Sequence, residues 1–275
     1  MVQGQIKYRQ SVISYRLSGS GPRVAVCFHG YGEEAKSFDF FSQYAGNEYR
    51  FLAIDLPYHG QTDWQEGLNL LPTELEEILH LLFEQVSIDY RQPDFRYTLV
   101  GYSLGGRVCL SLYQLRPEAV ERLVLLAPDG LKVNFWYWLA TQTRAGNQFF
   151  AFTMKKPQWF FGLVKGMNKT GLLNTSIFKF VKYYIGDPVV RQQLYSRWTS
   201  LRKLKPELST IKKQILQNHT ALRLIYGIHD RIILSSIGKK FIRGMETDSR
   251  LIEIHAGHQV LHEKHVKEIL PALLQ

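Results

Sequence analysis

This 275-residue chain has no long apolar run and no cysteine-rich framework, and its first residues do not show the pattern of a leader segment. No stretch approaches the roughly 20 continuous apolar residues that a membrane-spanning helix needs, so we predict none. Residues 1–10 are polar and lack the apolar centre of a signal peptide, so we predict no cleaved leader. Cys27 and Cys109 both fall in predicted core elements, where unpaired thiols are common, which favours a reduced, cytoplasmic setting.

Motifs for metals and nucleotides are missing as well. The nine histidines show no metal-ligand spacing, and neither C-x-x-C nor H-E-x-x-H occurs. Gly30-Tyr31-Gly32 lacks the third glycine of a dinucleotide-binding turn. We therefore predict neither a metal nor an organic cofactor.

Acidic residues are scarce in one part of the chain. The net charge is +10, and residues 129–219 hold fifteen lysines and arginines against three acidic residues, so the excess belongs to this segment. The segment is also aromatic and matches no nucleic-acid-binding module, so we predict no nucleic-acid partner. A basic aromatic surface favours instead an anionic substrate or the surface of an acidic membrane, and a solvated basic face is the plain alternative.

Apolar runs alternate with helical patterns over most of the rest. The alternation predicts an α/β fold with a mostly parallel sheet covered by helices on both faces. Two short antiparallel strands are predicted first (5–9, 11–17), then buried strands at 23–28, 51–55, 97–100, 122–127, 222–226 and 250–254. Helices are predicted at 35–44, 73–86, 237–243 and 261–274, and Thr73 with Glu76 fits a capping box for the second.

The alternation stops at Asp129 and resumes at Leu222. The stretch between them has no strand pattern, and it is rich in tryptophan, phenylalanine and lysine. We predict a core domain from residues 1–130 and 206–275, interrupted by a helical cap at 131–205.

A nucleophile motif lies where the strand at 97–100 gives way to a helix. It reads Gly101-Tyr-Ser103-Leu-Gly105, the G-x-S-x-G pattern of a sharp turn that lifts a serine hydroxyl clear of the sheet. The flanking glycines are expected because a Cβ at either position would clash.

A nucleophilic serine needs a base and an orienting acid, and both are available at strand ends. Asp230 follows the strand at 222–226, and His258 follows the strand at 250–254. Asp129 is a rival acid, although we expect it to cap the first helix of the insertion. The rival bases are His255, expected within its strand, and His262 and His265, expected in surface roles on the last helix.

Together these motifs resemble the α/β-hydrolase superfamily, in its capped serine-hydrolase branch of esterases, lactonases and carbon–carbon bond hydrolases. The matching stretches are His29-Gly30, Asp55-Leu-Pro-Tyr-His-Gly60, Leu125-Leu-Ala-Pro128, Gly227-x-x-Asp230, and Gly257-His258 followed by Glu263. Gln259 departs from the pattern, because relatives often carry an aromatic or apolar residue there.

The resemblance implies a role for each residue. Ser103 would attack a carbonyl, His258 would move its proton, and Asp230 would orient the imidazole. The backbone N–H groups of Tyr31 and Leu104 would form the oxyanion hole. Loop-shaping roles would fall to His29, Gly30, Gly101 and Gly105.

We therefore expect a serine hydrolase that acts on a small-molecule ester, thioester or related acyl compound, anionic or lipidic. Two alternatives stay open: a carbon–carbon bond hydrolase or lyase with the same triad, and a non-catalytic ligand-binding protein on this fold. We expect a cytoplasmic protein in contact with acidic membranes through the cap, and the sequence sets no oligomeric state.

Overall fold

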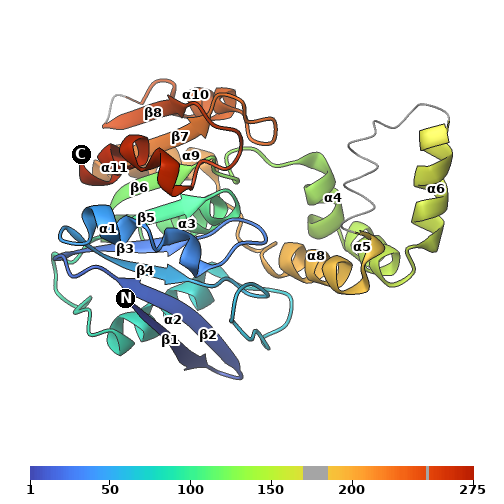
Figure 1. Ribbon diagram of the computed structural model, residues 1–275, viewed down its shortest axis with the longest axis horizontal. Coiled ribbons are helices and arrows are strands. Elements are labelled where there is room, and N and C mark those ends of the chain that lie inside the picture. The colour runs from blue at the N-terminus through green and yellow to red at the C-terminus, as the bar shows by residue number, and fades with distance from the viewer. Residues whose placement is uncertain (170–184, 246–247) are drawn as a thin grey trace. The chain divides into compact units, whose positions relative to one another are not determined.

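The computed structural model describes residues 1–169, 185–245 and 248–275 (Figure 1). The chain divides into two compact units. The sheet unit comprises Met1–Glu66, Leu70–Lys132 and Lys203–Gln275, and the helical unit comprises Gly67–Asn69 and Val133–Arg202. The chain therefore leaves the sheet unit twice, once for a three-residue excursion at 67–69 and once for the main helical insertion.

One sheet organises the sheet unit. Its eight strands in the described residues run in the order β1-β2-β4-β3-β5-β6-β7-β8. Their bounds are Val2–Tyr8 (β1), Ser11–Ser18 (β2), Arg23–Phe28 (β3), Tyr49–Ile54 (β4), Tyr97–Tyr102 (β5), Val120–Leu126 (β6), Ala221–Gly227 (β7) and Ser249–Ile254 (β8). β1 and β2 pair antiparallel, β2 meets β4 antiparallel, and every pairing from β4 to β8 is parallel. The mostly parallel sheet predicted from the sequence is confirmed.

The apolar strands are continuous because helices cover both faces of the sheet (Figure 1). β3 shows this plainly, since Val24 to Phe28 are all buried. Ala25 and Cys27 join a core cluster with Phe38, Phe41 and other side chains from the helices on their face. Val24, Val26 and Phe28 alternate with them along the strand, so they belong to the opposite face.

The helices of the sheet unit form two groups by their contacts. α2 (Pro72–Gln85), α3 (Leu104–Leu115) and α9 (Leu208–Asn218) pack in a row, whereas α1 (Phe41–Ala45) packs on α11 (Val266–Leu274). α10 (Ser235–Ile242) contacts β7 and β8. Short 3₁₀ turns are η1 (Ala35–Phe38), η2 (Pro117–Ala119) and η3 (Glu263–His265).

Two local expectations about helix starts were wrong. α2 begins at Pro72, and the Glu74 carboxylate accepts from the Leu71 N–H at 2.9 Å, so the capping pair is not Thr73 with Glu76. The final helix begins at Val266 after η3, and His265 in that turn is buried.

Within the helical unit, residues 133–169 and 185–202 contain helices and no strand. The helices are α4 (Phe135–Gln142), α5 (Arg144–Lys155), α6 (Gln158–Lys169) and α8 (Pro188–Ser200). Aromatic side chains join three of them: the Trp198 ring of α8 lies 5.4 Å from Tyr137 of α4 and 5.8 Å from Phe150 of α5. Nowhere in the described ranges does a helix reach the length and apolar character of a membrane span.

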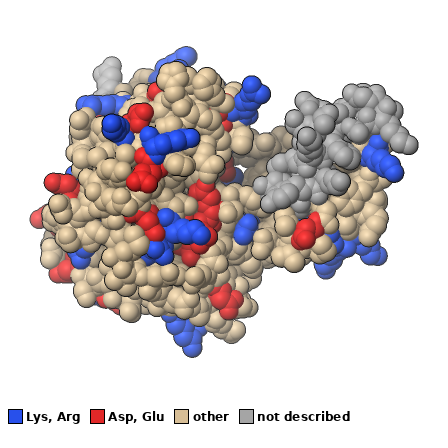
Figure 2. Space-filling view, viewed as in Figure 1, with Lys and Arg blue, Asp and Glu red and all other residues tan. Residues whose placement is uncertain are grey.

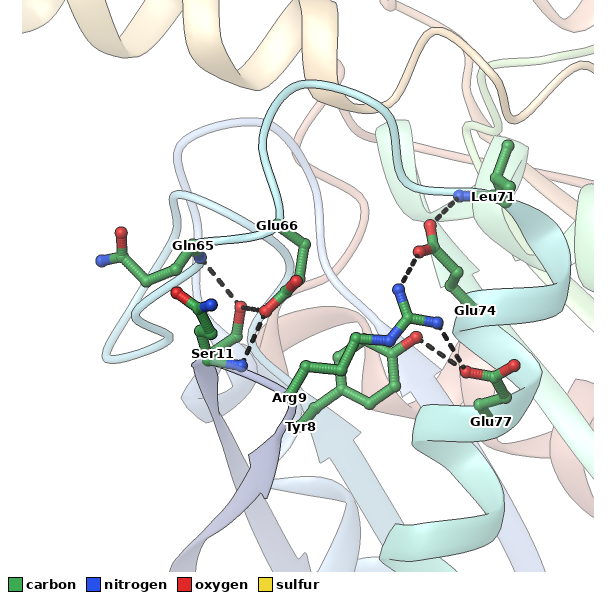
Figure 3. Close-up of polar contacts among 9 residues, drawn as sticks. Tyr8, Arg9, Ser11, Gln65, Glu66, Leu71, Glu74 and Glu77 are labelled. Carbon is green, nitrogen blue, oxygen red and sulfur yellow. Dashed lines mark hydrogen bonds and ion pairs between the residues drawn. The ribbon is translucent and has the colours of Figure 1, made fainter.

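A polar network fixes both ends of the 67–69 excursion to the turn between β1 and β2 (Figure 3). At one end, the Glu66 carboxylate accepts from the Ser11 hydroxyl at 3.0 Å. At the other end, Glu74 accepts from the Leu71 N–H and from the Arg9 guanidinium, which lies 2.7 Å from it. The excursion therefore begins and ends at defined points of the sheet unit.

Candidate active site

Ser103 lies in a strained turn between β5 and α3. Its φ of +48° and ψ of −112° are unfavourable for an L-residue with a side chain. Three backbone hydrogen bonds hold this conformation. The Ser103 N–H donates to the Leu126 carbonyl at 2.9 Å, and the Ser103 carbonyl accepts from Gly106 at 2.9 Å and Asp129 at 2.8 Å. The turn is thus fixed by its neighbours in the sheet.

Close backbone approach explains the glycines of the motif. A Cβ on Gly105 would lie 1.9 Å from the Phe28 carbonyl oxygen, and one on Gly101 would lie 2.6 Å from the Gly105 oxygen. On the facing loop, a Cβ on Gly30 would meet the Tyr102 ring at 2.9 Å and Ser103 Cβ at 3.4 Å. The loop after β3 therefore passes directly beside the serine.

The structure brings Ser103, His258 and Asp230 together. Ser103 Oγ lies 3.0 Å from His258 Nε2, and His258 Nδ1 lies 2.8 Å from Asp230 Oδ2. Asp230 is only 5% exposed, and its second oxygen accepts from the N–H groups of Ile232 and Ile233. An ionised Asp230 only accepts, so His258 Nδ1 carries the proton and Nε2 is left to accept from the Ser103 hydroxyl. This arrangement can draw a proton from Ser103 as its oxygen attacks an electrophile.

The rival acid is engaged elsewhere. Asp129 forms an ion pair with Arg107 and accepts from the Gly130 N–H at 2.7 Å. Asn134, not Asp129, caps α4, because its side chain accepts from Trp136 at 2.9 Å. The expectation that Asp129 caps that helix was wrong.

The rival histidines occupy other positions. His255 is exposed just beyond β8, outside the strand where we expected it, and its ring lies 6.1 Å from that of His229. His262 Nδ1 accepts from the Lys264 N–H at 3.2 Å at the start of η3. His265 is buried in η3, contrary to the surface role expected for it.

The two expected oxyanion donors belong to two segments that meet at Ser103, the start of α3 and the loop after β3. Leu104 is the first residue of α3, so its N–H has no carbonyl one turn earlier within the helix. Tyr31 lies on the loop that Gly30 brings against Ser103. That the two amides bind an oxyanion stays a prediction.

Buried polar side chains hold the Tyr31 loop. His29 is fully buried; its Nδ1 donates to the Gly30 carbonyl at 2.8 Å, and its Nε2 accepts from the Leu56 N–H at 3.1 Å. Asp55 accepts from the Ala35 N–H at 2.7 Å, at the far end of the loop. These bonds fix the neutral form of His29, which gives it a structural position rather than that of a base.

Sequence reasoning missed Tyr102 and Glu33, two side chains beside His258, and noted Gln259 only as a departure from the pattern of relatives. The Tyr102 hydroxyl donates to the His258 carbonyl at 3.2 Å, and the Gln259 amide donates to Glu33 Oε1 at 3.3 Å. Glu33 Oε2 is buried and has no hydrogen-bond partner within the described residues. Burial raises the pKa of Glu33, and burial together with the Glu33 charge raises the pKa of Tyr102. Only the unusual polarity of Gln259 could have pointed to this cluster.

The histidines, cysteines and acidic residues in the described ranges form no group of three that could hold a metal ion.

Comparison with known proteins decides the family. A family model described as "Serine aminopeptidase, S33" matches residues 21–265. The chain belongs to this α/β-hydrolase family. The match begins just before β3 and runs through His258, so it covers every candidate site residue.

Individual proteins that this chain resembles share from 14% to 33% sequence identity with it. An uncharacterised hydrolase, YugF, from Bacillus subtilis (strain 168) is 24% identical over 89% of this chain and 86% of its own. Esterase Rv0045c from Mycobacterium tuberculosis is 33% identical, over 42% of this chain and 36% of its own. A thermophilic esterase from Thermogutta terrifontis has a similar structure, with a TM-score of 0.66, 14% identity and coverage of 100% of this chain and 98% of its own. That structural likeness establishes the shared fold.

Proposed function

We propose that the protein is a serine hydrolase that cleaves a carboxylic ester, a thioester or a related acyl compound through an acyl-enzyme. The observation that carries the proposal is the contact chain from Ser103 through His258 to the buried Asp230, at 3.0 and 2.8 Å. It stands on a strained turn that three backbone bonds hold in place, which keeps the hydroxyl aimed before substrate arrives.

The residues divide the work as follows. Ser103 Oγ attacks the carbonyl carbon while its proton passes to His258 Nε2, and the N–H groups of Tyr31 and Leu104 donate to the oxyanion. His258 then protonates the leaving alkoxide or thiolate as its bond to the carbonyl carbon breaks. Water, deprotonated by His258, attacks the carbonyl carbon of the acyl-enzyme. As the bond from that carbon to Ser103 Oγ breaks, His258 returns the proton to Oγ, and the acid and free Ser103 are released. Asp230 stays ionised and holds the imidazolium in place.

The names of the relatives favour acyl substrates. Both the Mycobacterium tuberculosis relative and the Thermogutta terrifontis structure are called esterases, and a structure titled as a thioesterase domain from the curacin pathway shares the fold, with a TM-score of 0.60. The family model, however, is described as a serine aminopeptidase. The substrate panel must therefore contain amides as well as esters and thioesters.

The test is covalent labelling of the protein by a fluorophosphonate probe, together with turnover of p-nitrophenyl esters of increasing chain length, acyl-CoA thioesters and aminoacyl p-nitroanilides. We expect labelling and preferential ester or thioester turnover. Ser103→Ala should abolish labelling and lower turnover by about 10⁴-fold. Ser111→Ala removes a buried hydroxyl from α3, the helix that follows Ser103, and should leave both labelling and turnover unchanged. Failure of the wild-type protein to label, with no acyl turnover, would favour the ligand-binding alternative.

A further inference from the structure

The outer faces of α5 and α6 carry large apolar side chains where a surface helix ordinarily presents polar ones. On α5, Phe149 is 57% exposed and Phe152 is 48% exposed. On α6, Leu163 is 51% exposed and Trp159 is 37% exposed. The rings of Phe149 and Trp159 lie 5.1 Å apart, so the exposed apolar side chains of the two helices meet at this pair. We call these four residues the α5–α6 face.

The same two helices also carry exposed lysines. Lys155 and Lys156 end α5 and Lys165 lies on α6, and all three are exposed. In the described part of the chain, no carboxylate forms an ion pair with any of them. Residues 133–202 hold ten lysines and arginines and a single acid, Asp187.

The one acid of this segment is already engaged. Asp187 caps α8, where its carboxylate accepts from Val189 at 2.7 Å and Val190 at 3.0 Å. In Figure 2, lysine and arginine outnumber acidic side chains on the visible surface of this part of the molecule. The charge of the helical unit is therefore complementary to an anionic partner.

We propose that the α5–α6 face binds the surface of a membrane that contains acidic phospholipids. Tryptophan and phenylalanine would enter the boundary between headgroups and acyl chains, and the flanking lysines would meet the anionic headgroups. An anionic small substrate would account for the lysines alone, whereas it gives no reason for four exposed apolar side chains beside them. A merely solvated face would not carry them either.

The test is co-sedimentation of the full-length protein with vesicles of phosphatidylcholine, with and without phosphatidylglycerol. We expect binding that grows with the fraction of phosphatidylglycerol and weakens as salt is added. Lys155→Glu with Lys156→Glu should weaken binding at least about 30-fold, because each basic residue near an acidic surface contributes about one kcal/mol. Phe152→Ser with Leu163→Ser removes apolar groups without changing charge and should weaken binding at least about 10-fold.

The matched control is Lys264→Glu with Lys267→Glu. It changes the net charge equally, on exposed residues of the sheet unit, and should keep wild-type binding. Circular dichroism and thermal unfolding establish that each variant is folded. If the control loses as much vesicle binding as Lys155→Glu with Lys156→Glu, binding follows net charge alone and the proposal is overturned. Absence of binding of the wild-type protein to acidic vesicles would overturn it as well. A dimer in sedimentation velocity that Phe152→Ser with Leu163→Ser dissociates would assign the face to a second copy instead. None of these outcomes depends on the hydrolase activity.

Discussion

Asp230 and Asp129 each follow a strand of the parallel sheet, yet their carboxylates have different partners. Asp230 faces His258 Nδ1 and two backbone N–H groups, whereas Asp129 faces the Arg107 guanidinium and Gly130. The first set of contacts orients an imidazole. The second set joins α3 to the end of β6, which stabilises the fold around the Ser103 turn.

Exchange of each acid for its amide separates these roles. Asp230→Asn should lower kcat by about 10⁴-fold with little change in fold, because an amide no longer fixes the productive tautomer of His258. Asp129→Asn should keep most of the activity but lower the free energy of unfolding by about 1–3 kcal/mol through the lost charged hydrogen bond. Steady-state kinetics and urea unfolding on both variants measure this. If the two variants lose kcat to a comparable extent, the assignment of the orienting role to Asp230 is wrong.

Glu33 gives a pH-dependent prediction. Burial raises the pKa of the Glu33 carboxyl in the folded state. The contribution of Glu33 to stability is therefore fully present below its pKa in the unfolded chain, about 4.3, and is lost as the pH rises through its pKa in the folded protein. Glu33→Gln stays neutral throughout. Its Tm should therefore exceed that of the wild type at pH 8, by a margin that narrows towards pH 4. Thermal scans at both values measure this, and Glu34→Gln controls for removing one charge from the same loop.

At the scale of elements, capping chemistry sets where helices begin. α9 starts after Glu207, whose carboxylate accepts from the N–H groups of Ser209 at 3.2 Å and Thr210 at 2.7 Å. Hydrogen bonds lower the pKa of Glu207 to about 2, with the largest contribution from Ser209 and the next from Thr210. The stabilisation that Glu207 gives is therefore present above its pKa in the unfolded chain, and it is lost as the pH falls through its pKa in the folded protein.

Glu207→Gln should lower Tm at pH 7, and its difference from wild type should shrink between about pH 4 and pH 2 as the wild-type carboxyl becomes protonated. Glu207→Asp keeps a charged cap and should behave like the wild type. Circular dichroism melts across this range are the measurement. A constant difference down to pH 2 would mean that the charge of Glu207 plays no part.

Strands were easier to predict from the sequence than helix ends. β3 matches its expected range residue for residue, because a strand buried on both faces is a continuous apolar run. The start of α2 was misplaced, since Pro72 and Glu74 supply the first turn while Thr73 does not cap it. The expected helix at 35–44 is broken into η1 and α1, and the core contains Phe38 from the first and Phe41 from the second.

At the scale of the whole molecule, the sequence pattern was informative wherever a residue follows a strand. Ser103, Asp230 and His258 could be named because parallel strands end at one edge of the sheet. Glu33 could not, because its neighbours come from separate loops with no spacing that relates them. The grouping of Gly67–Asn69 with the helical insertion was equally hidden, because it depends on contacts such as the 3.0 Å hydrogen bond from Arg202 to Asn69.

The position of the insertion has a consequence for synthesis of the chain. β6 pairs with β7, yet residues 127–220 lie between them, and Leu123 to Leu126 are fully buried in the finished sheet. At ribosomal rates these residues take roughly 5 to 20 seconds to appear, and an apolar parallel edge stays unpaired meanwhile. A nascent chain halted at residue 205 should therefore bind chaperones and pellet without them, whereas release of the complete chain should restore solubility. We therefore expect the chaperone demand of this protein to fall once β7 has emerged from the ribosome.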